Sequence, residues 1–520
     1  MINRSEFSED ITHFHPFLPQ KSLFKAYDIR GELRWFTDDF LLSLSFAFAN
    51  LFKKNNNCVV VGYDVRQYSE HIAKFLAYAC HKIGLQVYWL GQITTPMMAF
   101  MASRYSGNGL MITASHSEKH IHGIKWLVNH QSPSSEDILA LFNTLTEVVD
   151  LDISLHQKIL QIVDNIDKID NAFWQYQQAT THAIANIRQH IYPNKIINTT
   201  IKKIVIDCMN GATSCYAFDF FSNFGFDCIV LNDTPDPNFP KGNPDPCEQG
   251  RLNELCQAVI THTADIGLAF DGDGDRLMVV DSSGTILKPD DLLYILAGIA
   301  IDEYQKPHAY QSEVIFDVKC SHHLPLLIAQ HGALPIMEKT GSSLMRQSLQ
   351  NKSRFSIFAG ELSGHFLFND GYFILHDDAM YAGLRLLNWL SFQEKSLTDI
   401  LKNLPTSIST PDMYIPIDSN ESGILFIKRL LNLTKKPFWA IKQRFMINNV
   451  QTIDGLRLDF QYGFGILRKS NTGNFLTVRF SADNLENLQK VQNVFVDLCH
   501  FIDENPDKNI AKQVATIRPL

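Results

Sequence analysis

The sequence lacks long hydrophobic segments and an excess of basic residues. Its most apolar early run, FLLSLSFAFANLF, is interrupted by serine and asparagine and is shorter than the roughly 20 residues that a membrane-spanning helix requires. Lys and Arg together number 46 against 55 for Asp and Glu, which gives a net charge of −9 over 520 residues. This composition argues against a membrane or a nucleic acid as the main partner, but it leaves room for a local basic pocket that binds a small anion.

Cysteine pairs with the spacing of zinc or redox sites are also missing. The nine cysteines are scattered, none forms a CxxC pair, and most lie in apolar runs such as CVVVGYD. The first ten residues, MINRSEFSED, lack the apolar core of a secretion signal. We therefore expect a cytoplasmic protein with reduced thiols.

The length and the apolar pattern predict several domains, because 520 residues exceed what one hydrophobic core usually holds. Three segments share a plan of apolar strand, amphipathic helix and second strand, and they begin at 58–64, 203–211 and 313–321. Strand–helix–strand units favour parallel pairing. We therefore expect three related α/β domains.

The last hundred residues follow a different plan. Short strands are expected in GLRLDF, FGILRKS and FLTVRF, with polar turns between them. An amphipathic helix should follow, with one apolar face made of Leu485, Leu488, Val491, Phe495 and Leu498. This pattern predicts a small α+β domain.

The stretch DGDGDR carries the strongest chemical signal. An apolar strand leads into Asp271, Asp273 and Asp275, and the glycines between them let the chain turn so that the carboxylates converge. Converging carboxylates suit Mg²⁺ or Ca²⁺. An EF-hand is excluded, because its sixth and twelfth positions would be Arg276 and Ser282 in place of Gly and Glu. A purely structural acidic turn is the alternative, although three uncompensated carboxylates would repel one another.

The stretch TASHSEKHIHGIKW places Ser115 directly after an apolar strand, and His116, His120 and His122 follow. A histidine metal site would need a further ligand, and the stretch offers only Glu118. A Ser-His-Asp hydrolase would have a GxSxG turn, and none surrounds the serine. From these residues alone, a nucleophile, a metal site and a polar loop all stay open.

The stretch FAGELSGHFLF places Glu361, Ser363 and His365 at alternate positions. In an extended loop these three side chains would share one face. A carboxylate, a hydroxyl and an imidazole on one face suit the recognition of sugar hydroxyls. The alternative is an ordinary polar turn between two strands.

Two further stretches offer groups for a phosphate. GILRKSNTGN gathers basic and hydroxyl residues in a short loop between glycines, and FKAYDIRGEL places Tyr27 and Arg30 before a glycine. Hydroxyls, backbone N–H groups and a guanidinium in one loop suit a phosphate group. Each stretch could equally be an exposed turn or an N-terminal loop.

Taken together and in this order, YDIRG, TASH…GxK, DGDGDR, GExSGH and RxSNT resemble the motifs of the α-D-phosphohexomutase superfamily. The resemblance runs from about Phe24 to Ile502, and GExSGH is most similar to the bacterial phosphomannomutase/phosphoglucomutase branch. It implies an α/β fold of three related mixed α/β sandwich domains and a C-terminal α+β (TBP-like) domain around a central cleft. The implied domains are 22–168 with the phosphoserine loop, 169–285 with the metal-binding loop, 286–409 with the sugar-binding loop and 410–520 with the phosphate-binding loop.

The resemblance also implies an activity. A phosphohexomutase interconverts hexose 6-phosphate and hexose 1-phosphate, here mannose and/or glucose phosphates, through a phosphoserine enzyme and a 1,6-bisphosphate intermediate. It implies Mg²⁺ as cofactor and glucose 1,6-bisphosphate (or mannose 1,6-bisphosphate) as activator. The implied partners are small phosphosugars, with no nucleic acid and no membrane, and the chain is expected to be a monomer. Alternatives are a mutase for another sugar such as glucosamine phosphate, a non-catalytic phosphosugar-binding homologue, and a metal-dependent phosphatase.

The resemblance assigns roles to matching residues. The catalytic set is Ser115, His116, Lys125 and Arg276. The metal ligands are Ser115, Asp271, Asp273 and Asp275. The implied substrate-binding residues are Tyr27, Arg30, Lys319, Glu361, Ser363, His365, Arg468, Ser470, Asn471 and Thr472.

The sequence departs from the family pattern near two of these motifs. Ser117 and Glu118 stand where the family has Asn-Pro, and His122 stands where it has Asn. In KTGSSL, Ser342 stands where the branch has a histidine that helps with substrate contact or proton transfer. These changes raise the question of sugar preference and of catalytic efficiency.

Overall fold

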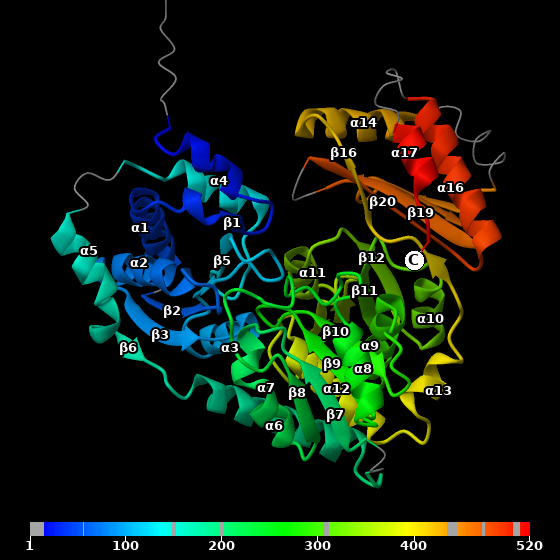
Figure 1. Cartoon of the computed structure of the whole chain (residues 1–520), viewed down its shortest axis with the longest axis horizontal. Coiled ribbons are helices and arrows are strands. Elements are labelled where there is room, and N and C mark those ends of the chain that lie inside the picture. Colours follow the sequence, from blue (N-terminus) through cyan, green and yellow to red (C-terminus); the bar gives the residue numbers. More distant parts are fainter. Residues whose placement is uncertain are drawn as a thin grey trace, which may run out of the picture.

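The computed structural model describes residues 15–55, 57–147, 152–197, 201–304, 311–433, 446–470, 474–502 and 510–519. Its strands form four sheets, each with its own helices, and the predicted α/β fold class is confirmed (Figure 1). We call each sheet with its helices the first, second, third and fourth domain. The exact domain limits given above stay a prediction.

The first domain has a mixed sheet with the strand order β1-β5-β4-β2-β3-β6. Its strands are β1 Ile29–Glu32, β2 Cys58–Tyr63, β3 Gln86–Gln92, β4 Gly109–Ile112, β5 Ile121–Leu127 and β6 Asp167–Lys168. Its helices are α1 Asp38–Asn55, α2 Ser69–Lys82, α3 Thr95–Tyr105, α4 Ser135–Asn143 and α5 Ile153–Leu160. Helix α2 ends as predicted just before Gly84, which adopts a φ of +84° that suits glycine.

The second domain has the strand order β10-β9-β7-β8 and the third has β12-β11-β13-β14. In the second domain the elements are α6 Ala172–Ile191, β7 Lys203–Asp207, α7 Ala217–Ser222, β8 Asp227–Leu231, α8 Asn253–Thr261, β9 Ile266–Phe270 and β10 Leu277–Asp281. In the third they are α9 Pro289–Glu303, β11 Glu313–Asp317, α10 Leu324–Gln330, β12 Leu334–Glu338, α11 Ser342–Leu349, β13 Ser356–Gly360, β14 Phe366–Phe368, α12 Ala379–Leu390 and α13 Leu397–Leu401. The three strand–helix–strand units pair their strands in parallel, as predicted.

The fourth domain has an antiparallel sheet, with β16 and β15 both pairing with β20. Its elements are β15 Ile408–Ser409, β16 Met413–Pro416, α14 Asn420–Leu433, β17 Asn449–Gln451, β18 Leu456–Phe460, β19 Gly463–Lys469, β20 Phe475–Ala482, α16 Leu485–His500 and α17 Ile510–Thr516. The apolar face of α16 packs on the sheet as predicted, except that Leu485 at its first position is 58% exposed. Leu485 is the first residue of the helix, so the periodic pattern overestimates the buried face by one position.

The cores of the domains are not equally separate. One continuous apolar cluster joins α3 and α6 with the sheets of the second and third domains, and α12 packs against β9, β10 and β14. The fourth domain has a core of its own. No disulfide joins the nine cysteines, all of which lie in the described part of the chain. Within the described ranges, no helix is both long and apolar enough to cross a membrane.

The sheets bring the sequence motifs together. Most of the predicted site residues of the first three domains follow β4, β9, β11 and β13 at the carboxyl ends of these strands, whereas Arg30, Lys125 and Arg468 lie in β1, β5 and β19. In open α/β sheets, ligands bind outside the carboxyl ends of the strands.

Candidate active site

A cleft of about 470 Å³ is lined by residues of all four domains. The predicted site residues that line it are Tyr27, Arg30, Ser115, His116, Lys125, Asp275, Arg276, Lys319, Glu361, Ser363, His365, Arg468 and Ser470. Asp271 and Asp273 are fully buried beside them. Asn471 and Thr472 lie outside the described residues, so their predicted role stays a prediction.

Ser115 lies in a tight turn after β4. Its φ of +51° is unusual for a residue with a side chain, and its N–H donates to Thr113 Oγ1 at 2.9 Å. This turn directs the hydroxyl at the acidic loop, where Ser115 Oγ donates to Asp271 Oδ2 at 2.6 Å. The hydroxyl therefore lies against the first carboxylate of the DGDGDR motif.

The three aspartates converge as the spacing predicted. Their carboxylate oxygens lie within 4.8 Å of one another, and all three residues are buried. Asp271 Oδ1 accepts three backbone N–H groups of its own loop, which turns Oδ2 toward Ser115. Asp273 Oδ1 is buried without a hydrogen-bond donor among the described residues. Buried oxygen ligands with an unsatisfied acceptor fit a hard divalent cation such as Mg²⁺.

A glycine lets the acidic loop approach the serine loop. A Cβ on Gly272 would lie 2.5 Å from the carbonyl oxygen of Ser115 and 2.9 Å from Pro244. The backbone of Gly272 also accepts the N–H of Ala212. The motif therefore needs glycine at this position for close packing against the first domain.

Cationic groups surround the carboxylates. Lys125 Nζ donates to Asp273 Oδ2 at 2.8 Å and to Asp275 Oδ2 at 2.5 Å. Burial and the neighbouring carboxylates Asp275 and Asp273 raise the pKa of Asp271 well above its usual range. Burial would also raise the pKa of Asp275, but Lys125 and then His365 hold it well below its usual range. The cluster thus has a strong affinity for positive charge.

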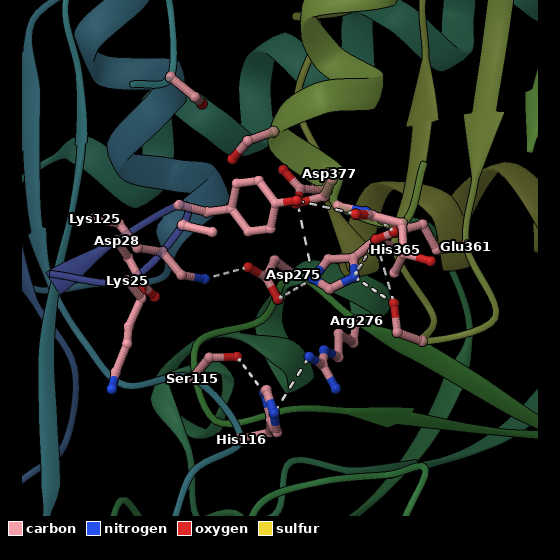
Figure 2. Close-up of a pocket in the computed structure, with 18 of the residues that line it drawn as sticks. Lys25, Asp28, Ser115, His116, Lys125, Asp275, Arg276, Glu361, His365 and Asp377 are labelled. Carbon is pink, nitrogen blue, oxygen red and sulfur yellow. Dashed lines mark hydrogen bonds and ion pairs between the residues drawn. The ribbon is translucent and has the colours of Figure 1, made fainter. Parts of the chain in front are cut away.

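His116 lies between the serine and Arg276, as Figure 2 shows. Ser115 Oγ is 3.2 Å from His116 Nδ1, and Arg276 Nη2 is 3.4 Å from His116 Nε2. Because a guanidinium can only donate, Nε2 accepts and Nδ1 carries the hydrogen. Burial, Arg276 and Arg30 lower the pKa of His116 well below its usual range, so the ring is neutral. Arg276 itself pairs with Asp245 at 3.6 Å.

The GELSGH loop differs from the predicted extended form. Glu361 to Gly364 form a tight turn closed by the Gly364 N–H on the Glu361 carbonyl, so the alternating-face prediction is wrong. The three side chains still meet, because the turn brings His365 Nδ1 to 2.9 Å from Ser363 Oγ and 3.2 Å from Glu361 Oε2. His365 Nε2 lies 3.3 Å from Asp275 (Figure 2). Burial opposes a charge on His365, but Asp275 and then Glu361 raise its pKa to about 10.

The fourth domain contributes a guanidinium to the cleft. Arg468 Nε donates to Asp454 at 2.7 Å, whereas its Nη2 is buried without a partner among the described residues. Lys319 of the third domain reaches Asp412 at 2.8 Å. An unpaired guanidinium nitrogen in the same cleft as a lysine suits a phosphate oxygen.

Family models match most of the chain. The models described as "Phosphoglucomutase/phosphomannomutase, alpha/beta/alpha domain I", "domain II" and "domain III" match residues 21–148, 182–284 and 288–408. The chain belongs to the phosphoglucomutase/phosphomannomutase family. The resemblance to the α-D-phosphohexomutase superfamily is thereby confirmed.

Individual members of this family are similar over nearly their full length. A phosphomannomutase/phosphoglucomutase of Pseudomonas aeruginosa is 33% identical over 94% of this chain and 98% of its own. A phosphoglucomutase of Neisseria gonorrhoeae is 34% identical over the same shares. The crystal structure of a family protein from Burkholderia thailandensis superposes with a TM-score of 0.77 at 28% identity, covering 95% of this chain and 99% of that one. The chain is therefore a mutase of the phosphoglucomutase/phosphomannomutase family.

The most important residue that sequence reasoning missed in this mutase is Arg66. Its buried guanidinium pairs with Asp64 and donates to backbone carbonyls of the Ser115 loop at 2.7 to 3.0 Å. The loop has no regular secondary structure, so this one side chain satisfies its buried carbonyls. The signal in the sequence was an Asp-x-Arg at the end of the strand CVVVGYD.

The residues that depart from the phosphoglucomutase/phosphomannomutase pattern differ in whether they line the cleft. Ser117 accepts a hydrogen bond from Arg30 at 3.0 Å, and the exposed Glu118 pairs with His120 at 3.4 Å. His122 is buried in β5 and does not line the cleft. Ser342 does line it, together with His376, a histidine that sequence reasoning missed.

Proposed function

We propose that this mutase interconverts hexose 6-phosphate and hexose 1-phosphate, with mannose and glucose phosphates as its substrates. The observation that carries the proposal is the 2.6 Å hydrogen bond from Ser115 to Asp271 within a buried cluster of three carboxylates. The mannose and glucose substrates follow from the names of the relatives described above.

In this proposal Ser115 carries the phosphoryl group. A phosphoserine has about −1.5 to −2 charges, and Lys125 and Arg276 provide positive charge at the serine. Burial lowers the pKa of the Lys125 ammonium, but Asp273 and Asp275 outweigh that effect and raise its pKa, so it stays charged. Neutral His116 flanks the same group through its Nδ1 hydrogen.

Asp271, Asp273 and Asp275, with an oxygen of Ser115, would hold the Mg²⁺ ion. The ion, when bound, supplies a Lewis acid that stabilises charge on the transferred phosphoryl oxygens. The buried, unsatisfied Oδ1 of Asp273 supports this assignment. The residues around the cluster hold the serine hydroxyl and the cationic groups in fixed positions, so little reorganisation accompanies the transfer.

The sugar and its second phosphate would be bound by the third and fourth domains. Glu361, Ser363 and His365 offer a carboxylate, a hydroxyl and an imidazolium to the sugar hydroxyls. Arg468 and Ser470 would bind the non-reacting phosphate, with the predicted Asn471 and Thr472. Tyr27, Arg30 and Lys319 line the cleft between these groups.

The reaction requires two transfers with a reorientation between them. Phosphoserine first gives its group to the free hydroxyl of the monophosphate, which forms a 1,6-bisphosphate. The bisphosphate turns over and returns its other phosphoryl group to Ser115. The distal phosphate site must therefore accept either end of the sugar, which calls for a fourth domain that can release and bind again.

A coupled assay tests the proposal. The purified chain is given Mg²⁺, a trace of glucose 1,6-bisphosphate, and mannose 1-phosphate, glucose 1-phosphate or glucosamine 1-phosphate. Turnover of the mannose or glucose ester is expected. Turnover of glucosamine 1-phosphate alone would contradict the substrate assignment, and Ser342 in the cleft makes that comparison informative.

A further inference from the structure

Two histidines and an aspartate meet where the third and fourth domains touch. His322 and His323 follow β11 and precede α10, and Asp483 lies between β20 and α16. His322 Nε2 lies 2.9 Å and His323 Nε2 lies 3.0 Å from the same oxygen, Asp483 Oδ1. The two imidazole rings lie 3.9 Å apart between centroids. None of the three residues lines the active-site cleft.

The backbone on both sides of this cluster is held in place. Arg457 of β18 is buried and donates to the carbonyl oxygens of Val318 and Cys320, both at 2.7 Å. Its charge is balanced by Asp459 at 2.7 Å. The Asp483 N–H donates to the carbonyl of Tyr462 at 3.0 Å. The histidine loop is thus fixed to the fourth domain by contacts other than the cluster.

Hydrogen bonding alone does not account for the arrangement. His323 Nε2 is 3.0 Å from the carboxylate oxygen, yet it makes no hydrogen bond there, because the oxygen is not in line with the ring nitrogen. His322 Nδ1 is buried and also lacks a partner among the described residues. A neutral imidazole binds a metal ion through the lone pair of a ring nitrogen, so these two rings are suited to act as metal ligands.

We propose that His322, His323 and Asp483 form a binding site for a borderline divalent cation such as Zn²⁺, and that the bound ion joins the third and fourth domains. The three ligand atoms lie within 4.8 Å of one another. Tetrahedral zinc bonds of about 2.0–2.1 Å require ligand atoms roughly 3.3 Å apart. The 2.9 and 3.0 Å separations of the histidine nitrogens from Asp483 need only a small widening to reach this value, and water can fill the fourth position. Two imidazoles and one carboxylate suit Zn²⁺ better than Mg²⁺, which prefers oxygen ligands only.

A metal ion bound at this site should slow turnover, an inference that rests on the proposed function. Arg468 and Ser470 belong to the same domain as Asp483, and the reorientation of a bisphosphate requires that domain to release the distal phosphate. An ion that binds ligands from both domains would hold the cleft closed. Zn²⁺ at this site is therefore expected to slow turnover without occupying the aspartate cluster.

Metal binding by the full chain tests the site directly. The chelator-treated protein is saturated with Mg²⁺ to fill the aspartate cluster, and Zn²⁺ affinity is measured by competition with a chromophoric chelator. Asp483→Asn and His323→Gln are each expected to weaken one Zn²⁺ site at least tenfold. Asp38 with His71 and His156 provides a matched control of the same composition. The two histidines contact different oxygens of Asp38, at 3.3 and 3.4 Å, and all three residues belong to the first domain. His71→Gln should leave the affinity unchanged, and equal affinities in the wild type and in the Asp483 and His323 variants would overturn the proposal.

Turnover measured with and without Zn²⁺ then tests the link between the domains. At saturating Mg²⁺, Zn²⁺ should slow the wild type and His71→Gln several-fold, and Asp483→Asn should escape this inhibition. Equal inhibition of all three would place the effect at the aspartate cluster and overturn the proposed domain link. A chain that binds Zn²⁺ at His323 but turns over no sugar phosphate would contradict the proposed substrates and leave the metal site intact.

Discussion

Ser115 and Arg468 line the same cleft, but the segments around them are attached to the molecule in different ways. The Ser115 loop packs backbone to backbone against Gly272, and Thr95, Lys125 and Ser115 of the first domain all donate to the acidic loop of the second. One apolar cluster also runs from α3 of the first domain through the second and third domains, in addition to the first domain's own cluster. The serine and the aspartates are thus held as one unit.

The segment around Arg468 belongs to a domain with its own core. Its contacts with the third domain are largely polar, such as Lys319 with Asp412 and Arg457 with two carbonyl oxygens. A small apolar cluster of Val318, Phe464 and Ile466 completes this interface. A hydrogen bond that is exchanged for bonds to water contributes little net stability. We therefore expect the fourth domain to separate from the third more easily than the first domain separates from the second.

Replacement of Ser115 by alanine should have the largest effect. Without the hydroxyl no phosphoserine can form, and we expect turnover to fall on the order of 10⁴-fold or more, as for other enzymes that lose their nucleophile. Initial rates with glucose 1-phosphate and mannose 1-phosphate measure this. Ser470→Ala, on the fourth-domain side, is the matched control and should retain most of its kcat with a raised KM. Similar rates for wild type and Ser115→Ala would contradict the phosphoserine assignment.

Replacement of Gly272 by alanine should loosen the fixed corner. The added Cβ would lie 2.5 Å from the Ser115 carbonyl oxygen, a backbone atom that cannot give way easily. We expect a destabilisation of about 2–3 kcal/mol and a marked loss of kcat, because overpacking shifts the backbone. Thermal unfolding and initial rates report the two effects.

The control for Gly272 is Gly298→Ala in α9, where the nearest atom is the end of the His331 side chain at 3.3 Å. Alanine is favoured over glycine within a helix, so this variant should be neutral or slightly stabilising. If both glycine variants behave alike, the close approach of the two loops is not what requires glycine at 272.

Replacement of Arg468 by methionine should affect binding more than chemistry. Its buried Nη2 has no partner among the described residues, so a phosphate would gain a charge-assisted hydrogen bond there. Loss of that bond should raise KM for the phosphosugar about tenfold or more, roughly 1.5–3 kcal/mol, with a smaller change in kcat. Steady-state kinetics measure this, and exposed Lys490→Met on α16 serves as the control. A pure kcat effect would argue against a separable phosphate site.

The features of the fold and of the site that could be predicted from the sequence depend on residues close together in the chain. Apolar runs marked the strands, and DGDGDR placed three carboxylates on one turn, because glycines and alternating aspartates act within six residues. Arg66 and Asp412 were missed, since each acts on a partner more than forty residues away. The turn at Glu361 was left as the alternative to an extended loop, because alternation of polar residues suits both a strand and a turn closed by Gly364, which has a φ of +90°.

Replacement of His331 should have the smallest effect on stability. This residue lies at neither end of the cleft, so its replacement reports what one surface ion pair contributes to stability. His331 Nε2 lies 2.9 Å from Asp302 Oδ1 and joins the C-terminal ends of α9 and α10. The hydrogen bond to Asp302 raises the pKa of His331 above 6.5, against the effect of burial. A histidine whose pKa is higher in the folded state than in the unfolded state stabilises the fold. The stabilisation is complete below the unfolded-state pKa and is lost as the pH rises through the folded-state pKa.

Both side chains of this pair are partly exposed, at 30% and 49%, so screening limits the contribution to about 0.5 kcal/mol. The free energy of opening of α10, measured by amide hydrogen exchange, should be higher in the wild type than in His331→Gln by that amount at about pH 5.5. The two values should converge at about pH 9. A difference that grew with pH would have the wrong sign. The fourth domain can separate during turnover only if each of its polar contacts with the third domain is about as weak as this surface pair. Arg457 is buried and therefore the contact most able to be stronger. Amide hydrogen exchange in β18 would show whether the Arg457 contacts open as easily as the others.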